Sequence, residues 1–154
     1  MVLRRLAALF GVTMLAMFGL SVVVAPAASA AVSCSGTITY DHTYYYNGNP
    51  VAEVTIYYNS TNGGTNSACL YHRGAWYGKS TFTLIGMSRC KQHTAAPGSD
   101  CNVDYQPQPD SGDYAYYAGP VGVTGTADYC VEAYGLMALS QTFTLNIDTG
   151  TRGC

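Results

Sequence analysis

The chain has 154 residues, of which only 10% are charged, and its formal net charge at pH 7 is −2. A chain of this length forms one domain with a buried core. Its weakly negative charge, without clusters of basic residues, excludes the electrostatic footprint of a nucleic-acid-binding protein.

The first 30 residues have the three parts of a secretory signal peptide. Arg4 and Arg5 give a basic start, the stretch 6–24 is apolar, and a run of small residues ends at Ala30. Signal peptidase cleaves after such a run. We therefore expect cleavage after Ala30 rather than a membrane anchor, and a single secreted β domain over residues 31–154. Removing the two arginines leaves five basic against nine acidic residues, so the mature formal charge is −4.

The segment 51–58 is the clearest strand of the mature region. Its apolar side chains alternate with polar ones, so that one face carries Ala52, Val54, Ile56 and Tyr58. The preceding segment 40–46 is expected to pair with it as a hairpin, because Asn-Gly at 47–48 is typical of a two-residue turn.

Two later segments repeat the alternation. Phe82 and Leu84 are expected to face the core, opposite Thr81 and Thr83. Near the C-terminus the inward set is expected to be Phe143, Leu145 and Ile147.

The segment around Cys130 leaves two alternatives open. An apolar face of Tyr129, Val131 and Ala133 places Cys130 beside Glu132 on the opposite face. If Cys130 is bridged inside the core, either Glu132 also points inward or a bulge changes the phase. Short strands separated by frequent Gly and Pro turns predict an all-β fold, a small antiparallel sandwich or barrel.

All six cysteines follow residue 30, and an even number in a small secreted domain predicts three disulfides. Zinc binding is disfavoured, because no Cys-x-x-Cys pair exists and the histidines are not at ligand spacing. Fifteen pairings are possible. We favour a bridge between Cys90 and Cys101 across the polar loop 91–100, one between Cys34 and Cys154 at the two mature ends, and one between Cys69 and Cys130 in two predicted strands.

The sequence shows no constellation of catalytic residues. The triplets 110–112 and 148–150 look like aspartic protease signatures, but their contexts differ and both are expected to be turns. The only glutamates, Glu53 and Glu132, have no spacing that brings them together as a glycosidase pair. The aspartates between 100 and 113 lack the ligand spacing of a calcium loop. We expect no enzymatic activity, no cofactor and no metal.

Tyrosine is the unusual component, with fourteen residues that all follow position 30. Adjacent residues of a strand point to opposite faces, so each tyrosine pair exposes a ring or packs it against a second layer. Two interpretations stay open: cross-strand packing, and a stacking platform for sugars. The candidate platform residues are Tyr45, Trp76, Tyr77 and Tyr117.

Two segments carry a family resemblance. Residues 110–134 read DSGDYAYYAGPVGVTGTADYCVEAY, and residues 54–70 read VTIYYNSTNGGTNSACL. Together they resemble the spore-associated protein A family, small secreted proteins of filamentous, spore-forming bacteria. The most specific piece is the hexapeptide 116–121. The segment 90–101 looks like an addition, and Tyr-Gly at 134–135 stands where the family pattern has tryptophan and glycine.

The resemblance implies an extracellular role at the envelope or spore surface and a bridge between Cys69 and Cys130. It implies no catalytic residues. We therefore favour a non-enzymatic secreted protein associated with the spore or cell surface, whose partners are cell-wall or spore-surface polysaccharide or protein. The alternatives are a carbohydrate-binding module that uses exposed tyrosines, and a secreted inhibitor or toxin that presents the loop 91–100. No nucleic acid and, after cleavage, no membrane are expected as partners.

Overall fold

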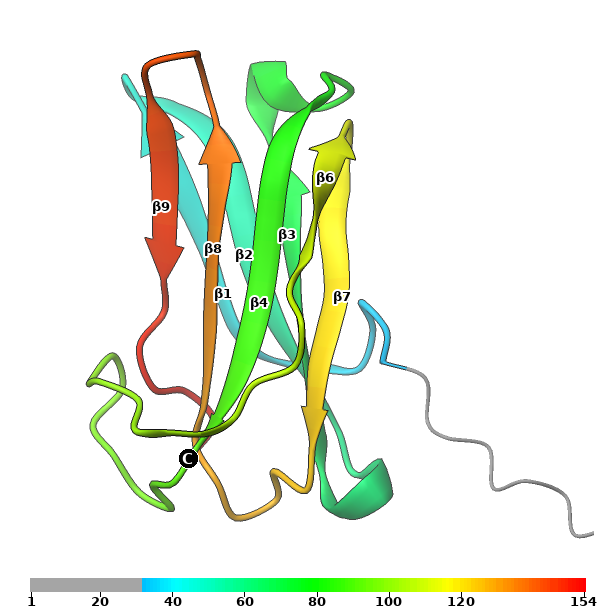
Figure 1. The fold of residues 1–154 in the computed structure, drawn as a ribbon, viewed down its shortest axis with the longest axis vertical. Coiled ribbons are helices and arrows are strands. Elements are labelled where there is room, and N and C mark those ends of the chain that lie inside the picture. The colour runs from blue at the N-terminus through cyan, green and yellow to red at the C-terminus, as the bar shows by residue number, and fades with distance from the viewer. Residues whose placement is uncertain (1–31) are drawn as a thin grey trace, which may run out of the picture.

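A computed structural model describes residues 32–154. The predicted signal peptide, residues 1–30, lies outside the described residues. Two antiparallel β-sheets lie face to face over most of their length (Figure 1). The predicted all-β sandwich is thus confirmed.

Sheet 1 has four strands in the order β1-β2-β3-β7. The chain builds it from a hairpin, a third strand reached through the short 3-10 turn η1 (Thr61–Gly63), and a later strand. At the hairpin, Asn47 (φ 50°) and Gly48 (φ 76°) both adopt the left-handed backbone that a type I′ turn requires. The predicted hairpin is confirmed. The strands are β1 (Thr37–Tyr46), β2 (Asn49–Asn59), β3 (Thr65–His72) and β7 (Tyr117–Thr124).

Sheet 2 is built around its central strand β4 (Thr81–Cys90). On one side β4 pairs with β8 (Val131–Ala138), which in turn pairs with β9 (Thr144–Asp148). On the other side it pairs with two shorter strands, β5 (Val103–Tyr105) and β6 (Asp110–Tyr114). The 3-10 turn η2 (Gly74–Trp76) joins β3 to β4, at the same end of the sandwich as the turn between β6 and β7 (Figure 1).

The core lies between the two sheets and is formed by the alternate residues of each strand. As predicted, Ala52, Val54 and Ile56 of β2 are completely buried. Burying one aliphatic side chain of this kind contributes about 1.5–3 kcal/mol. Leu70 lies beside them on β3, and the largest core side chains of the facing sheet include Ile85, Met87, Val131 and Met137.

The phase predicted for β4 is wrong. Phe82 is 45% exposed and Leu84 is only half-buried, whereas Thr83 is completely buried. Ile85 and Met87 lie on the same face of β4 as Thr83 and fill the core, so this face points inward. The Thr83 hydroxyl has a hydrogen-bonding partner there. Its Oγ1 lies 2.8 Å from Nε2 of His72.

The phase predicted for β9 holds for its two inner residues. Leu145 and Ile147 pack on the core. Phe143 precedes the strand and is 39% exposed. Its ring lies 4.6 Å from that of Tyr46, measured between centroids.

Cys130 lies just before β8 begins, which resolves its ambiguous phase without a bulge. Val131 and Ala133 face the core, and Glu132 between them faces outward and is half-buried. Tyr129 lies outside the strand, with the Arg89 guanidinium 5.1 Å from its ring centroid.

The structure pairs Cys34 with Cys69, Cys90 with Cys101, and Cys130 with Cys154. The bridge across the polar loop agrees with the prediction. The pairings of Cys34 with Cys154 and of Cys69 with Cys130 are wrong.

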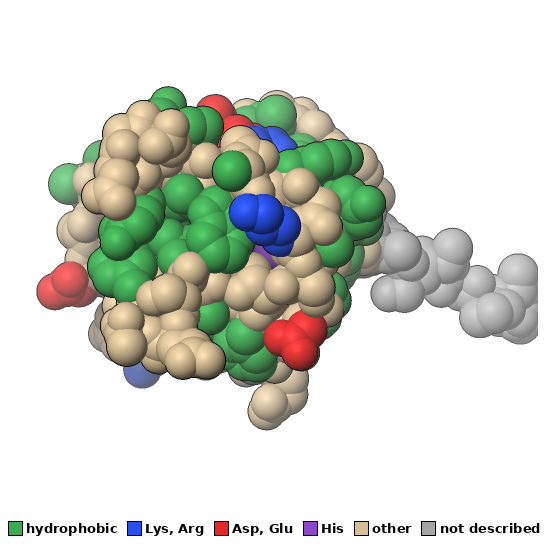
Figure 2. Space-filling view, turned by 90° about the horizontal axis from the view of Figure 1, so that it is seen from above, with side chains coloured by type: hydrophobic (Ala, Val, Ile, Leu, Met, Phe, Trp, Pro, Cys, Tyr) green, Lys and Arg blue, Asp and Glu red, His purple; other side chains and the backbone are tan. Residues whose placement is uncertain are grey.

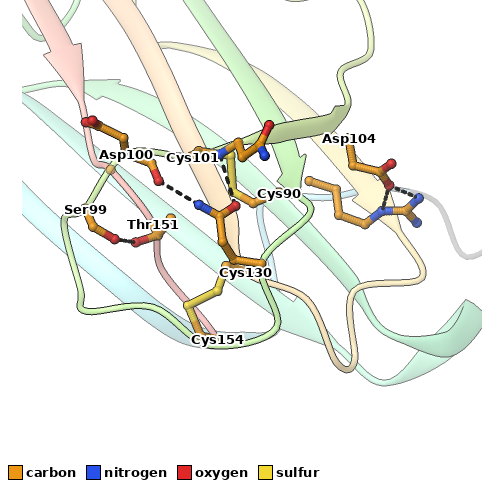
Figure 3. Close-up of a disulfide and its surroundings, with 12 residues drawn as sticks. Cys90, Ser99, Asp100, Cys101, Asp104, Cys130, Thr151 and Cys154 are labelled. Atoms are coloured by element: carbon orange, nitrogen blue, oxygen red, sulfur yellow. Dashed lines mark hydrogen bonds and ion pairs between the residues drawn. A yellow bond between two sulfur atoms is a disulfide. The ribbon is translucent and has the colours of Figure 1, made fainter.

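The two other pairings differ from the prediction because Cys69 and Cys130 each bond to a cysteine of a terminal segment that passes beside them. Cys69 lies on the outer face of sheet 1, where the segment before β1 crosses and Ser67 Oγ donates a hydrogen bond to the Ser33 carbonyl, 2.7 Å away. Cys130 lies beside the last residues of the chain, because Val131 and Arg152 exchange two backbone hydrogen bonds of 2.9 and 2.7 Å. Figure 3 shows the bridges of Cys130 and Cys90 next to each other.

The disulfides provide a first prediction. Replacing both cysteines of any one bridge by alanine should lower the free energy of unfolding by about 2–4 kcal/mol. The bridge between Cys34 and Cys69 spans 35 residues and that between Cys90 and Cys101 spans 11, so chain entropy predicts a loss about 1 kcal/mol larger for the first. Urea unfolding of the two double variants measures this difference. The reverse order would contradict the entropic account.

Candidate functional site

Exposed aromatic side chains are concentrated at one end of the sandwich. This end holds the β1–β2 hairpin, η2, the β6–β7 turn and the β8–β9 turn (Figure 1). Figure 2 looks onto it and shows hydrophobic side chains gathered around a basic one. The aromatic residues that these connections expose are Tyr45, Tyr46, Tyr77, Tyr116 and Phe143.

Four tyrosines of this region line one groove of about 450 Å³: Tyr71, Tyr77, Tyr116 and Tyr117. Tyr71 and Tyr117 are cross-strand partners on β3 and β7, with ring centroids 5.7 Å apart and ring planes inclined by 43°. Tyr77 and Tyr116 lie 5.0 Å apart at 65°. We call these four residues the tyrosine groove. Because the two rings of each pair are inclined to each other, the four rings form the walls of the groove and not a flat platform.

The backbone fixes both walls of the tyrosine groove. The Gly78 N–H donates to the carbonyl of Ala115 and the His72 N–H donates to that of Tyr116, both at 2.8 Å. These bonds hold the segment after β3 against the β6–β7 turn. Gly74 adds a close approach, since its φ is +55° and a β-carbon there would lie 2.5 Å from the Pro50 carbonyl oxygen. The backbone segments that carry the four tyrosines are therefore held together by contacts within the domain.

His72 connects the groove to the core beneath it. Its backbone belongs to β3, between Tyr71 and Arg73, and its side chain points between the sheets and is completely buried. Nε2 lies 2.8 Å from Oγ1 of Thr83 on β4. Burial lowers the pKa of the imidazole, which keeps the ring neutral. This pair joins the two sheets directly under the site.

A polar cluster flanks Tyr71 on the outer face of sheet 1. The hydroxyls of Tyr57 and Tyr71 are 2.8 Å apart, and the Arg73 guanidinium lies 5.0 Å from the Tyr71 ring centroid. Arg73 binds Glu53 through two hydrogen bonds of 2.7 and 3.1 Å. Burial and the bond from Tyr57 raise the pKa of Tyr71, and the bond from Arg73 lowers the pKa of Glu53. The cluster therefore presents protonated hydroxyls beside an ion pair with no net charge.

The structure brings two of the four predicted platform residues together, Tyr77 and Tyr117. Trp76 is half-buried, packs against the core and carries Lys79 Nζ 5.5 Å from its ring. Tyr45 is 64% exposed but lies on the β1–β2 hairpin, outside the groove. Sequence analysis missed Tyr71 and Tyr116. Their positions depend on the pairing of β3 with β7 and on the β6–β7 turn, which no local pattern encodes.

The two aspartic-protease-like triplets do not meet. Asp110 lies on β6 and Asp148 at the end of β9, and β4 and β8 separate these strands within sheet 2. The turn predicted at 110–112 is wrong, because these residues pair with β4. Asp110 instead accepts hydrogen bonds from the Tyr114 hydroxyl and the Gly119 N–H, at 2.5 and 2.6 Å. The turn predicted at 148–150 agrees with the bond from the Gly150 N–H to Asp148, at 2.8 Å.

A smaller polar pocket of about 310 Å³ lies between the loop 91–100 and the end of β9. Its lining includes Asp100, Glu132, Asp148 and Arg152. Burial and the neighbouring Asp148 raise the pKa of Glu132 to about 7. Across residues 32–154, no group of three acidic, histidine or cysteine side chains is placed to hold a metal ion.

The loop 91–100 is tied to the domain, although most of its residues stay exposed. Ala95 and Pro97 line a pocket together with Tyr40 and Arg152. The backbone of Thr151 bonds to that of Gly98 and Ser99, at 3.0 and 2.8 Å. The hydroxyls of Thr151 and Ser99 are also 2.8 Å apart (Figure 3).

Neither a protein-family model, nor a curated protein, nor a solved structure matches this chain significantly. In the part of the chain from Val32 onward, no helix is long and apolar enough to cross a membrane.

Glu132 provides a second prediction. Its folded-state pKa of about 7 lies above the 4.5 of an ordinary glutamate, so the stability linked to this proton is complete below pH 4.5 and is lost as the pH rises through 7. The variant Glu132→Gln should therefore lose less stability than the wild type between pH 5 and pH 8, as measured by urea unfolding at both values.

Glu53→Gln is the matched control for this experiment. The pKa of Glu53 is lowered by Arg73, so its stabilising ionisation is present at pH 8 and this variant should be less stable there than the wild type. Equal pH dependence of Glu132→Gln and wild type would contradict the assignment.

Proposed function

We propose that the mature domain is a non-enzymatic, exported protein that attaches to the cell or spore surface by binding polysaccharide through the tyrosine groove. The observation that carries this proposal is the convergence of Tyr71, Tyr77, Tyr116 and Tyr117 in one groove. A tyrosine ring offers an apolar face and a polar edge. The C–H face and the equatorial hydroxyls of a pyranose are complementary to both.

The chemistry of the groove supports binding rather than turnover. Its four lining residues are tyrosines, and burial raises the pKa of Tyr71 further. Protonated phenols donate and accept hydrogen bonds, but at neutral pH they are poor nucleophiles and poor bases. The carboxylate beside them, Glu53, is bound to Arg73.

Three features support a location outside the cell. The domain holds three disulfides, which persist in oxidising compartments. The N-terminal segment has the pattern of a signal peptide. The resemblance of segments 54–70 and 110–134 to the spore-associated protein A family adds the spore surface as the site of attachment.

Retention of the secreted protein on insoluble material tests the proposal. The probes are chitin, cellulose, peptidoglycan sacculi and intact spores, and we expect retention on at least one polysaccharide. Tyr77→Ala and Tyr116→Ala should each weaken binding by roughly 3- to 10-fold, because one aromatic contact contributes about 0.5–1.5 kcal/mol. Depletion isotherms measure the affinities.

Tyr105→Ala is the matched control variant. Tyr105 is 51% exposed, close to the 53% of Tyr116, but it lies on β5 in sheet 2 and does not line the groove. Its removal should leave binding unchanged. Absence of retention on every probe, or an equal loss in Tyr105→Ala, would refute the proposal.

A further inference from the structure

We infer that the tyrosine groove takes a single, uncharged chain of β-1,4-linked pyranoses, and not the flat surface of a crystalline polysaccharide. This inference rests on the proposed function and names the class of its ligand. Ring orientation, groove size and charge each bear on it.

Ring orientation argues against a flat ligand. A crystalline polysaccharide presents its sugar faces in one plane, and stacking on several of them at once requires coplanar rings. The ring planes of Tyr77 and Tyr116 are inclined by 65°, and those of Tyr71 and Tyr117 by 43°. When one ring of either pair lies flat on a plane, its neighbour meets that plane with its edge. A flat surface therefore stacks on one ring of each pair at most.

The same orientation suits a chain that enters the groove. In β-1,4-linked glucose-type sugars the ring substituents are equatorial, so both faces of each pyranose are apolar. Inclined walls contact one sugar from two sides, or successive sugars of a twisted chain from different directions. The groove volume of about 450 Å³ lies within the range of ligand sites, roughly 300–1,000 Å³. A groove of this volume can hold a short segment of a polysaccharide chain.

The ion pair beside Tyr71 favours a neutral chain. The guanidinium over the Tyr71 ring belongs to Arg73, and its charge is compensated by Glu53 at 2.7 Å. An anionic sugar would have to compete with this carboxylate for the arginine. The Tyr71 hydroxyl, 2.8 Å from that of Tyr57, keeps hydrogen-bonding capacity for a sugar hydroxyl.

The closing experiment uses two forms of the same polymers. Binding of the secreted protein is measured on acid-swollen and on crystalline cellulose and chitin, at equal accessible surface. The soluble hexasaccharides of both polymers are titrated with fluorescence detection. Trp76 is the only tryptophan of the chain and directly precedes Tyr77, so its emission reports on this site.

We expect saturable binding of at least one hexasaccharide, and at least 10-fold tighter binding to the swollen than to the crystalline form of that polymer. Tyr77→Ala should weaken hexasaccharide binding by about 3- to 10-fold. Tyr77→Phe keeps the ring and should retain most of the affinity. Tyr105→Ala should behave as the wild type. Because Tyr77 is 64% exposed, its replacement leaves the core intact.

The outcomes separate the two proposals. Equal or tighter binding to the crystalline form, or preference for polygalacturonate over the neutral hexasaccharides, overturns this inference and leaves polysaccharide binding standing. Failure to bind any form of any polysaccharide overturns the proposed function, and this inference with it.

Discussion

Between the sheets, the imidazole of His72 and the hydroxyl of Thr83 form a hydrogen bond in a setting that is otherwise apolar. A buried hydroxyl without a partner would cost about 1–3 kcal/mol, but that of Thr83 contacts the imidazole and also donates to the Thr81 carbonyl, 3.1 Å away. The imidazole gains one partner, while its Nδ1 is buried without one among the described residues. This contact links β3 to β4 at His72, whose neighbours along the chain are Tyr71 and Arg73. The tyrosine groove therefore lies beside a polar contact between the two sheets.

The two ends of the sandwich have different chemistry. One end is cross-linked by the bridges of Cys90 with Cys101 and of Cys130 with Cys154, and the chain ends there (Figures 1 and 3). The other end has turns held by backbone hydrogen bonds and exposes most of its aromatic rings. The covalent cross-links and the large exposed side chains are therefore separated by the length of the sandwich.

Local patterns predicted the local parts of this structure. The hairpin at Asn47-Gly48, the inward face of β2 and the bridge across the loop 91–100 each depend on residues close in sequence. The phase of β4, the partners of Cys34 and Cys130, and half of the groove depend on contacts between distant segments. Thr83 illustrates the reason: its residue type predicts exposure, and no local pattern indicates that another strand places an imidazole 2.8 Å from its hydroxyl.

The C-terminus lies at one end of the sandwich (Figure 1). Cys154 is joined to Cys130 at the end of the sandwich opposite η2. Anything linked after Cys154, whether a tether, a fluorophore or a solid support, leaves the tyrosine groove facing away from the attachment. A surface coated with this protein through its C-terminus would display one uniform aromatic face to the surrounding medium.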